Sequence, residues 1–190
     1  VQGEFIAKDN KAPDVGTGNK FSDPATFEYA RLAHPPVTFS HEKLKVSARL
    51  PAAQRYIVEH GLNELIEGEQ KSVGIIVQGG IYNILMRRLQ VMGLADAFGN
   101  SKIPVLVLNV THPLVPDQIT DFCAGKNAVL MVEEGNPEFM EHQVSSLLRK
   151  ADLSTKLHGK DILPAAGEYT ADVLQQGLVS FFELAMPTGI

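Results

Sequence analysis

Three short runs of consecutive apolar residues occur in the last two thirds of the chain, at residues 73–77, 103–108 and 129–132. The first run is followed by apolar residues at helical spacing, which are Ile81, Ile84, Leu85, Leu89 and Met92. Strands buried on both faces of a sheet read as unbroken apolar runs, and their alternation with amphipathic helices is typical of crossover βαβ units. The pattern predicts an α/β fold of three layers, α/β/α, around a mostly parallel sheet of four to five strands.

Further elements are predicted after the second and third runs. Residues 117–122 have helical spacing, and a segment around 157–163 is the candidate for a fourth strand. Asn136-Pro137 reads as an N-cap followed by proline at the first helical position, ahead of an apolar stripe at Met140, Val144, Leu147 and Leu148. The last helix is expected to begin at about Thr170. These elements would complete the sheet and its two helical layers.

The first 70 residues have a different pattern. Residues 1–23 lack long apolar runs and are rich in Gly, Lys, Asp and Asn, which indicates an irregular segment. Helical stretches are expected after Ser40 and after Pro51. The sequence therefore predicts an irregular and helical arm or linker over 1–70 and an α/β domain over 71–190.

Charge and composition narrow the classes of function. The chain has 190 residues, with 17 basic and 22 acidic side chains and a formal net charge of −5. Little positive charge is therefore available to neutralise the phosphates of a nucleic acid. No apolar run approaches the roughly 18 residues that indicate a membrane span. We expect neither a nucleic acid nor a membrane as a partner.

The single cysteine, Cys123, limits the redox chemistry of the chain. One cysteine cannot form an internal disulfide, nor can it supply the ligands of an iron–sulfur cluster. A reducing, cytoplasmic location is the expectation, with Cys123 as a small buried apolar residue beside Phe122. Because the chain starts at Val1 and shows no signal-peptide pattern, we expect an excised fragment of a longer protein, or else a processed chain.

Two glycines follow the first predicted strand. Gly79-Gly80 lies between that strand and its helix, where backbone amides and the helix dipole can hold an anion. The spacing matches neither the dinucleotide-binding fingerprint nor a P-loop, which favours a plain tight turn. Gln78 and Tyr82 flank the turn and are candidates to face a ligand or a neighbouring domain.

Polar residues also follow the other two predicted strands. Glu133 and Glu134 come directly after the third run, at the edge where ligands of open parallel sheets bind. One of them could act as a base, but adjacent strand-end side chains point in opposite directions, which favours a solvated strand end or an interface hydrogen bond. His112 follows the second run and could transfer a proton, although a loop histidine beside a proline is the commoner case.

Other chemical motifs are absent from the sequence. The histidines form no zinc-ligand pair, and there is no Gly-x-Ser-x-Gly elbow. Gly159-Lys160 and Gly167-Glu168 are expected to be solvent-exposed turns. We therefore predict no catalytic residue and no metal ligand. Two other readings remain open, an autonomous module that binds a phosphate or nucleotide at Gly79-Gly80 and a hydrolase or transferase that uses His112 and Glu133.

Several segments resemble one known family. GIIVQG at 74–79, THPLVP at 111–116 and VLMVEEG at 129–135 are similar to one domain of the thiamine diphosphate-dependent 2-oxoacid:ferredoxin oxidoreductases. The indolepyruvate ferredoxin oxidoreductases, in their fused-chain form, are the most similar, since LPAA at 50–53 and LPAAGEYT at 163–170 also match them. Five such motifs occur in the order that the family has.

The resemblance implies a transketolase C-terminal-like domain over 71–190 that lies between the two thiamine-binding domains of a longer chain. It implies that the parent enzyme decarboxylates arylpyruvates oxidatively to acyl-coenzyme A and reduces ferredoxin. Thiamine diphosphate, Mg²⁺ and iron–sulfur clusters would then be bound elsewhere in the parent, and none by this chain. The expected partners of this chain are other domains or subunits of the same oxidoreductase, and a homo-oligomer is expected. The whole enzyme would also bind ferredoxin and coenzyme A. The expected role here is a non-catalytic structural or interface domain.

Overall fold

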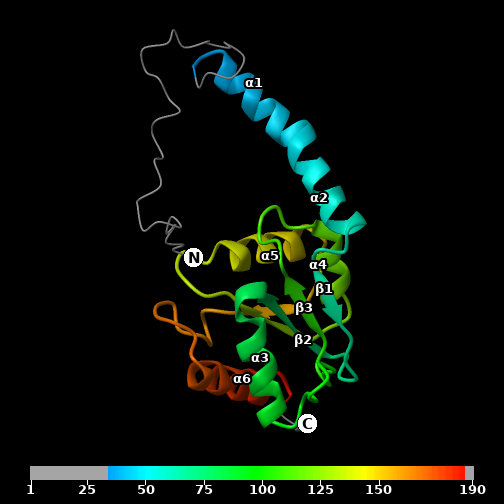
Figure 1. Cartoon of the computed structure of the whole chain (residues 1–190), viewed down its shortest axis with the longest axis vertical. Helices are drawn as coiled ribbons and strands as arrows, with labels where there is room; N and C mark the ends of the chain where they lie inside the picture. The colour runs from blue at the N-terminus through cyan, green and yellow to red at the C-terminus, as the bar shows by residue number, and fades with distance from the viewer. Residues whose placement is uncertain (1–33, 187–190) are drawn as a thin grey trace, which may run out of the picture. The chain divides into compact units, whose positions relative to one another are not determined.

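The computed structural model describes residues 34–186 (Figure 1). Contacts within the chain separate it into two compact units, Val1–Val46 and Ser47–Ile190. In the first unit the described helix is α1 (Val37–Leu44), and a π-helical segment, η2 (Lys45–Arg49), follows it in the sequence. All candidate site residues lie in the second unit.

The second unit contains a sheet with strand order β1-β3-β2-β4-β5. The strands are β1 (Glu64–Ile66), β2 (Val73–Gln78), β3 (Val105–Leu108), β4 (Ala128–Val132) and β5 (Lys156–His158). Strands β2 to β5 are parallel, whereas β1 pairs antiparallel with β3 at one edge. The prediction of a mostly parallel sheet of four to five strands is confirmed.

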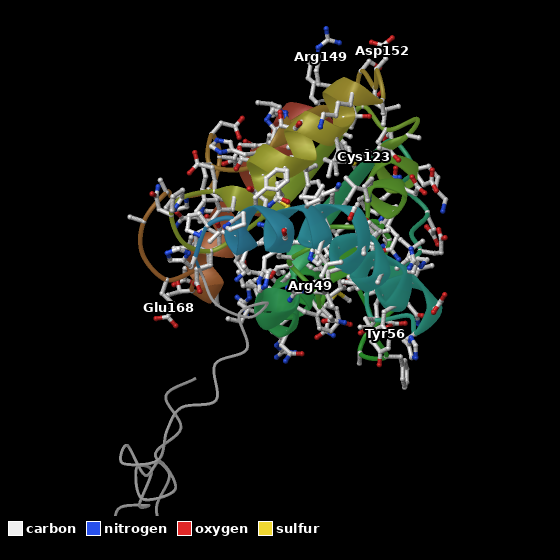
Figure 2. The ribbon with its side chains drawn as sticks, turned by 90° about the horizontal axis from the view of Figure 1, so that it is seen from above. Arg49, Tyr56, Cys123, Arg149, Asp152 and Glu168 are labelled. Atoms are coloured by element: carbon white, nitrogen blue, oxygen red, sulfur yellow. The ribbon has the colours of Figure 1, made fainter. Side chains whose placement is uncertain are left out.

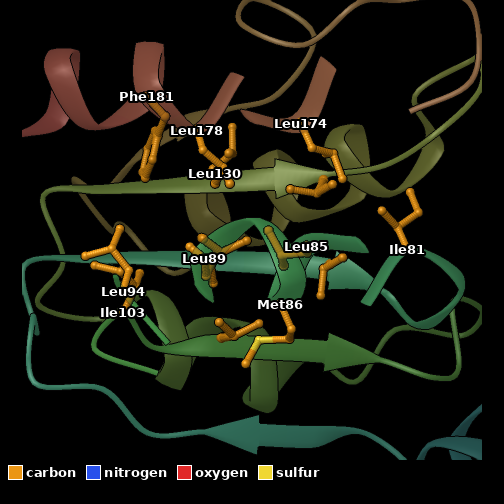
Figure 3. Packing of buried hydrophobic residues seen from close by; sticks show 14 of the residues in the cluster. Ile81, Leu85, Met86, Leu89, Leu94, Ile103, Leu130, Leu174, Leu178 and Phe181 are labelled. Atoms are coloured by element: carbon orange, nitrogen blue, oxygen red, sulfur yellow. The ribbon is translucent and has the colours of Figure 1, made fainter. Parts of the chain in front are cut away.

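Helices cover both faces of this sheet. These helices are α3 (Tyr82–Val91), α4 (Pro116–Cys123), α5 (Phe139–Lys150) and α6 (Ala171–Ala185), and the unit also contains α2 (Leu50–Glu59) and the 3₁₀ turn η3 (Gly79–Ile81). Helices α3 and α6 pack on one face, and α4 and α5 pack on the other. Figure 3 shows side chains of α3 and α6, among them Leu85, Leu89 and Leu178, packed over the strands. The three-layer α/β/α prediction is confirmed.

Each central strand has apolar side chains on both faces. In β2, Ile75 and Val77 point into the cluster under α3 and α6, and Ile76 points into the cluster under α4 and α5. Val129 and Leu130 of β4 divide between the same two clusters. Alternate side chains of a strand point to opposite faces, so a strand between two helical layers must be apolar at every position. This requirement explains the continuous apolar runs.

Several elements differ from the sequence prediction. Helix α1 begins at Val37 and contains Ser40, which was expected to precede it, and β5 ends at His158, before most of the predicted segment 157–163. Strand β1 was not predicted, because three residues are too few to show a strand pattern. Helix α5 begins at Phe139, so the prediction that Asn136 caps it and Pro137 opens it is wrong. The side chain of Glu133 supplies the cap instead, as described below. Helix α6 begins where expected, after Thr170, whose hydroxyl accepts a hydrogen bond from the amide of Val173. The boundary at residue 70 between arm and α/β domain stays a prediction.

Candidate functional site

The carboxyl ends of β2, β3, β4 and β5 lie at one edge of the sheet, because these strands are parallel. All the candidate residues lie at or shortly after the carboxyl ends of three of these strands. Gln78 ends β2, with Gly79, Gly80 and Tyr82 after it, His112 lies in the loop after β3, and Glu133 and Glu134 follow β4. This edge is where open parallel sheets bind their ligands, so the surroundings of each residue decide what the edge can do.

The Gly79 turn makes a close contact with the loop after β3. A Cβ atom on Gly79 would lie 2.5 Å from the Oδ1 atom of Asn109, whereas one on Gly80 would meet open space. Asn109 is held in place because its Nδ2 donates to the carbonyl of Leu62 (2.9 Å) and to the Oε1 of Glu64 (2.8 Å). The first glycine is thus required by packing, which accounts for the turn without a bound phosphate. Gln78 is half-buried beside it.

Tyr82 and His112 have different surroundings. Tyr82 is half-buried and packs against the core cluster beneath α3 and α6. His112 is exposed to solvent in the loop after β3. Within residues 34–186, no hydrogen bond or ion pair joins His112 to Glu133. The hypothesis of a hydrolase or transferase requires His112 and Glu133 to act together as acid and base. The two side chains are not paired in this structure.

Glu133 is buried, with 5% of its surface exposed, and both oxygens of its carboxylate accept hydrogen bonds from helix α5. The amide of Met140 donates to Oε1 (3.0 Å) and to Oε2 (3.1 Å), and the amide of Glu141 donates to Oε2 (2.9 Å). The first amides of a helix lack partners inside the helix, and the positive end of its dipole favours a negative charge. Glu133 therefore caps α5 and joins β4 to the helix that follows it.

Glu134 faces a different element from Glu133. Its carboxylate accepts a hydrogen bond from the backbone amide of Tyr169, at 2.5 Å, in the loop that leads to α6. Glu134 itself is exposed. The two adjacent carboxylates thus bind amides of separate segments, which agrees with the expectation that they point apart.

Lys160 follows the outer strand β5. Gly159-Lys160 forms a turn, but the prediction that this turn is exposed to solvent is wrong, because Gly159 is buried and Lys160 is half-buried. The Nζ of Lys160 donates to the carbonyl of Glu133 (2.5 Å), to the hydroxyl of Tyr169 (2.6 Å) and to the carbonyl of Pro164 (3.4 Å). Burial lowers the pKa of Lys160, and the negative charges of nearby carboxylates, first Glu133, oppose that shift. The prediction for Gly167-Glu168 agrees with the structure, and Figure 2 shows Glu168 at the periphery of the molecule.

Tyr169 completes the same network. Its ring is buried, the Lys160 ammonium lies 4.7 Å from the ring centroid, and its hydroxyl donates to the carbonyl of Pro164 at 2.8 Å. Burial, with the negative charges of Glu141, Glu134 and Glu133, raises the pKa of Tyr169 to about 12. We define the Lys160 network as Glu133, Glu134, Lys160 and Tyr169. It fixes the loop between β5 and α6 against the end of β4.

A second set of contacts holds the beginning of this loop. Gly159 is buried, and a Cβ atom there would collide with the carboxylate of Glu141, whose Oε2 accepts the amide of Lys160 (3.0 Å). His158 Nδ1 lies 2.7 Å from Oδ2 of Asp161. Burial acts to raise the pKa of Asp161, but hydrogen bonds from the Gly159 amide and the His158 ring outweigh it and lower that pKa. Glycine at 159 is therefore a packing requirement.

Cys123 is buried, as predicted. Burial raises the pKa of its thiol to about 12, so the thiolate needed for nucleophilic attack is not populated near neutral pH. Among residues 34–186, no three metal-ligating side chains gather in one place. In the same range, no helix combines the length and apolar character that crossing a membrane requires.

Comparison with known proteins identifies relatives of one kind. The indolepyruvate oxidoreductase subunit IorA of Methanothermobacter thermautotrophicus is 30% identical over 158 residues, which is 82% of this chain and 22% of the relative. The subunit of the same name from Thermococcus kodakarensis is 31% identical over 123 residues, or 64% of this chain and 18% of the relative. No family model matches the chain.

Two solved structures are also similar. A split-gene transketolase in an inactive tetramer has a TM-score of 0.45 and 16% identity, and it covers 67% of this chain and 43% of its own. A 2-oxoglutarate:ferredoxin oxidoreductase from Magnetococcus marinus has a TM-score of 0.45 and 18% identity, with 77% and 24% coverage. Both scores are below 0.5, and the fold assignment rests on the strand order and layers described above. The chain is thus related to a segment of the indolepyruvate oxidoreductase subunits named IorA, about a fifth of their length, which confirms the family resemblance expected from its motifs.

Proposed function

We propose that this chain is a non-catalytic structural and interface domain of a thiamine diphosphate-dependent indolepyruvate ferredoxin oxidoreductase. The parent enzyme would oxidatively decarboxylate arylpyruvates to acyl-coenzyme A and pass the electrons to ferredoxin. The support for this family role is the similarity to the IorA subunits, of which the chain spans about a fifth. Thiamine diphosphate, Mg²⁺ and the iron–sulfur clusters would be bound by other parts of the parent.

The observation that carries the non-catalytic role is the engagement of Glu133. A general base must lie within hydrogen-bond reach of the proton that it takes from its substrate. Both carboxylate oxygens of Glu133 already accept amides of α5, and the residue is buried. Lys160, the ionisable group beside it after β5, donates to three oxygens of the chain itself. The charged groups at the ends of β4 and β5 thus bind other groups of the chain, which is the behaviour of a scaffold.

Exposed apolar side chains support the interface role. In the described part of the second unit, several large apolar residues are more than half exposed, and these are Tyr56, Val58, Leu65, Val91, Phe98, Phe139 and Leu184. Phe98 alone is 91% exposed. Scattered exposed apolar residues are normal, but a domain that packs against others within a large enzyme is expected to have them on several elements. The partners proposed are other domains or subunits of the same oxidoreductase, including further copies of it.

Activity assays of the isolated chain and of the parent enzyme test this proposal. The purified chain, supplied with indolepyruvate, coenzyme A, thiamine diphosphate, Mg²⁺ and ferredoxin, is expected to consume no substrate. In the complete parent subunit, His112→Ala and Glu134→Gln are expected to leave kcat unchanged. Turnover by the isolated chain would overturn the proposal. So would a parent enzyme that loses its kcat on either substitution while it stays folded and assembled.

A further inference from the structure

A groove opens between the edge strand β1 and helix α4, away from the Lys160 network. Its volume is about 360 Å³, which is within the range of small-molecule sites. The groove exists because the sheet extends beyond the helix that covers it. Leu65 of β1 pairs in register with Leu106 of β3, yet Leu65 is 54% exposed and Leu106 is 4% exposed. Together with Phe122 of α4, these two leucines give the groove apolar walls.

Lys126 places a positive charge in this groove. Its ammonium lies 4.6 Å from the centroid of the Phe122 ring, and its side chain passes so close to Gly74 that a Cβ there would lie 2.9 Å from Cε. Within the described residues 34–186, its ammonium has no hydrogen-bond acceptor or ion-pair partner. The nearby carboxylate of Glu67 is already bonded to Lys71 at 2.7 Å.

Lys126 is half-buried, so its ammonium has lost part of its hydration, and no oxygen acceptor within residues 34–186 replaces that part. Burial lowers the pKa of Lys126, and repulsion from Lys71 adds to this while Glu67 opposes it. The Phe122 ring compensates only in part, because a cation–π contact is weaker than a charge-assisted hydrogen bond to a carboxylate. A ligand with one carboxylate would therefore supply the hydrogen-bond acceptor and the negative charge that the Lys126 ammonium lacks.

The remaining lining residues set the character of the ligand. Glu67, Lys71 and Asp121 also line the groove, so its two carboxylates balance its two ammonium groups and no surplus of positive charge is available for a ligand with several negative charges. At another part of the groove, the side-chain amides of Asn63 and Gln118 bond to each other at 3.0 Å. The apolar lining residues, which are Leu65, Pro104, Leu106 and Phe122, remain for the body of the ligand. A volume of this size also suits a small molecule better than the broad, flatter surface of a protein interface.

We propose that this groove binds a small monocarboxylate with an apolar body, its carboxylate on the Lys126 ammonium and its apolar body against Leu65, Leu106 and Phe122. The proposal does not depend on the proposed function. The groove could bind its ligand whether or not the chain assembles into an oxidoreductase, and failure of one test leaves the other unaffected.

Amide NMR spectra of the chain, recorded during titration with octanoate, test this proposal. Saturable shifts are expected for residues of β1, β3 and α4 around the groove. Octan-1-ol and octylamine, which lack the carboxylate, should bind at least tenfold more weakly than octanoate. Lys126→Met keeps the side chain over Phe122 but removes the charge, so it should weaken octanoate binding about tenfold. Leu65→Ser should weaken it as well, through the wall of the groove.

Matched variants and alternative outcomes complete the test. Lys150→Met removes an exposed lysine in the last turn of α5 and should leave octanoate affinity unchanged. Equal affinity for octanoate and octan-1-ol, unchanged affinity in Lys126→Met, or shifts confined to other surfaces would each overturn the proposal. If octanoate does not bind and an acidic, apolar segment of the parent enzyme shifts the same amides, the groove is a protein interface and the small-ligand proposal is wrong.

Discussion

The ammonium of Lys160 donates a hydrogen bond of 2.5 Å to the backbone carbonyl of Glu133, across 27 positions of sequence. The side chain of Glu133 points the other way and caps helix α5. One residue at the end of β4 thus holds both the helix that follows it and the loop after β5. At the ends of β4 and β5, the edge that binds ligands in other parallel sheets is occupied here by the chain's own charged groups.

Replacement of Lys160 should loosen the loop between β5 and α6. Lys160→Met keeps a long apolar side chain but removes the three hydrogen bonds to Glu133, Tyr169 and Pro164. Hydrogen bonds to charged groups are each worth more than neutral ones, so we expect a loss of about 2 kcal/mol in the free energy of unfolding. Urea denaturation measures this loss. The control, Lys150→Met, removes an exposed lysine and should change the stability by no more than about 0.5 kcal/mol. Equal stability of the two variants would contradict the structural role of Lys160.

Replacement of Glu133 should destabilise the start of α5. Glu133→Ala leaves the amides of Met140 and Glu141 without their acceptor in a partly buried place, and we expect a loss of about 2 kcal/mol. Glu133→Gln retains one acceptor oxygen and should lose less. Glu168→Gln, which changes an exposed carboxylate, serves as the control in the same urea experiment. Hydrogen exchange at the amides of residues 140 and 141 should be faster in Glu133→Ala. Unchanged exchange there would show that another group caps the helix.

The adjacent glycines of the turn after β2 should respond differently to alanine. Gly79→Ala would press a methyl group against Oδ1 of Asn109 and disturb the bonds of Asn109 to Leu62 and Glu64. Such overpacking costs about 1–3 kcal/mol. Gly80→Ala meets open space and should change stability by less than about 0.5 kcal/mol. Thermal unfolding of the two variants checks the difference. If Gly80→Ala proved the more harmful, the turn would have a role that this packing does not explain.

The sheet and most helices could be predicted because their patterns are local. Strands β3 and β4 are apolar at every position and β2 has no polar residue before Gln78, since a helical layer covers each face, and that signal is contained in a few consecutive residues. Thr170 likewise caps α6 from the adjacent position. Strand β1 has no such pattern, because its three residues are half-exposed or exposed at the edge of the sheet.

The roles at the candidate site could not be predicted, because they depend on contacts between distant segments. The cap of α5 comes from Glu133, seven positions before Met140, and not from Asn136 beside the helix. Lys160 lies in a stretch whose composition is typical of an exposed turn, yet its acceptors include an oxygen 27 positions away. Only the folded sheet, which places the ends of β4 and β5 side by side, brings these groups together.

Tyr169 should ionise at unusually high pH. Its pKa is raised to about 12, first by burial and then by the charges of Glu141, Glu134 and Glu133, so the fold favours the protonated hydroxyl. A raised pKa means that its contribution to stability is complete below its unfolded value of about 10 and is lost as the pH rises from about 10 through 12. The ultraviolet absorbance of tyrosinate reports this ionisation. The absorbance of the Tyr169→Phe variant is subtracted from that of the unsubstituted chain, and the difference belongs to Tyr169. We expect a transition near pH 12 in the folded chain and near pH 10 in urea, with circular dichroism reporting whether the fold persists. Ionisation near pH 10 with the fold intact would mean that the Tyr169 hydroxyl is not held by Lys160 and Pro164.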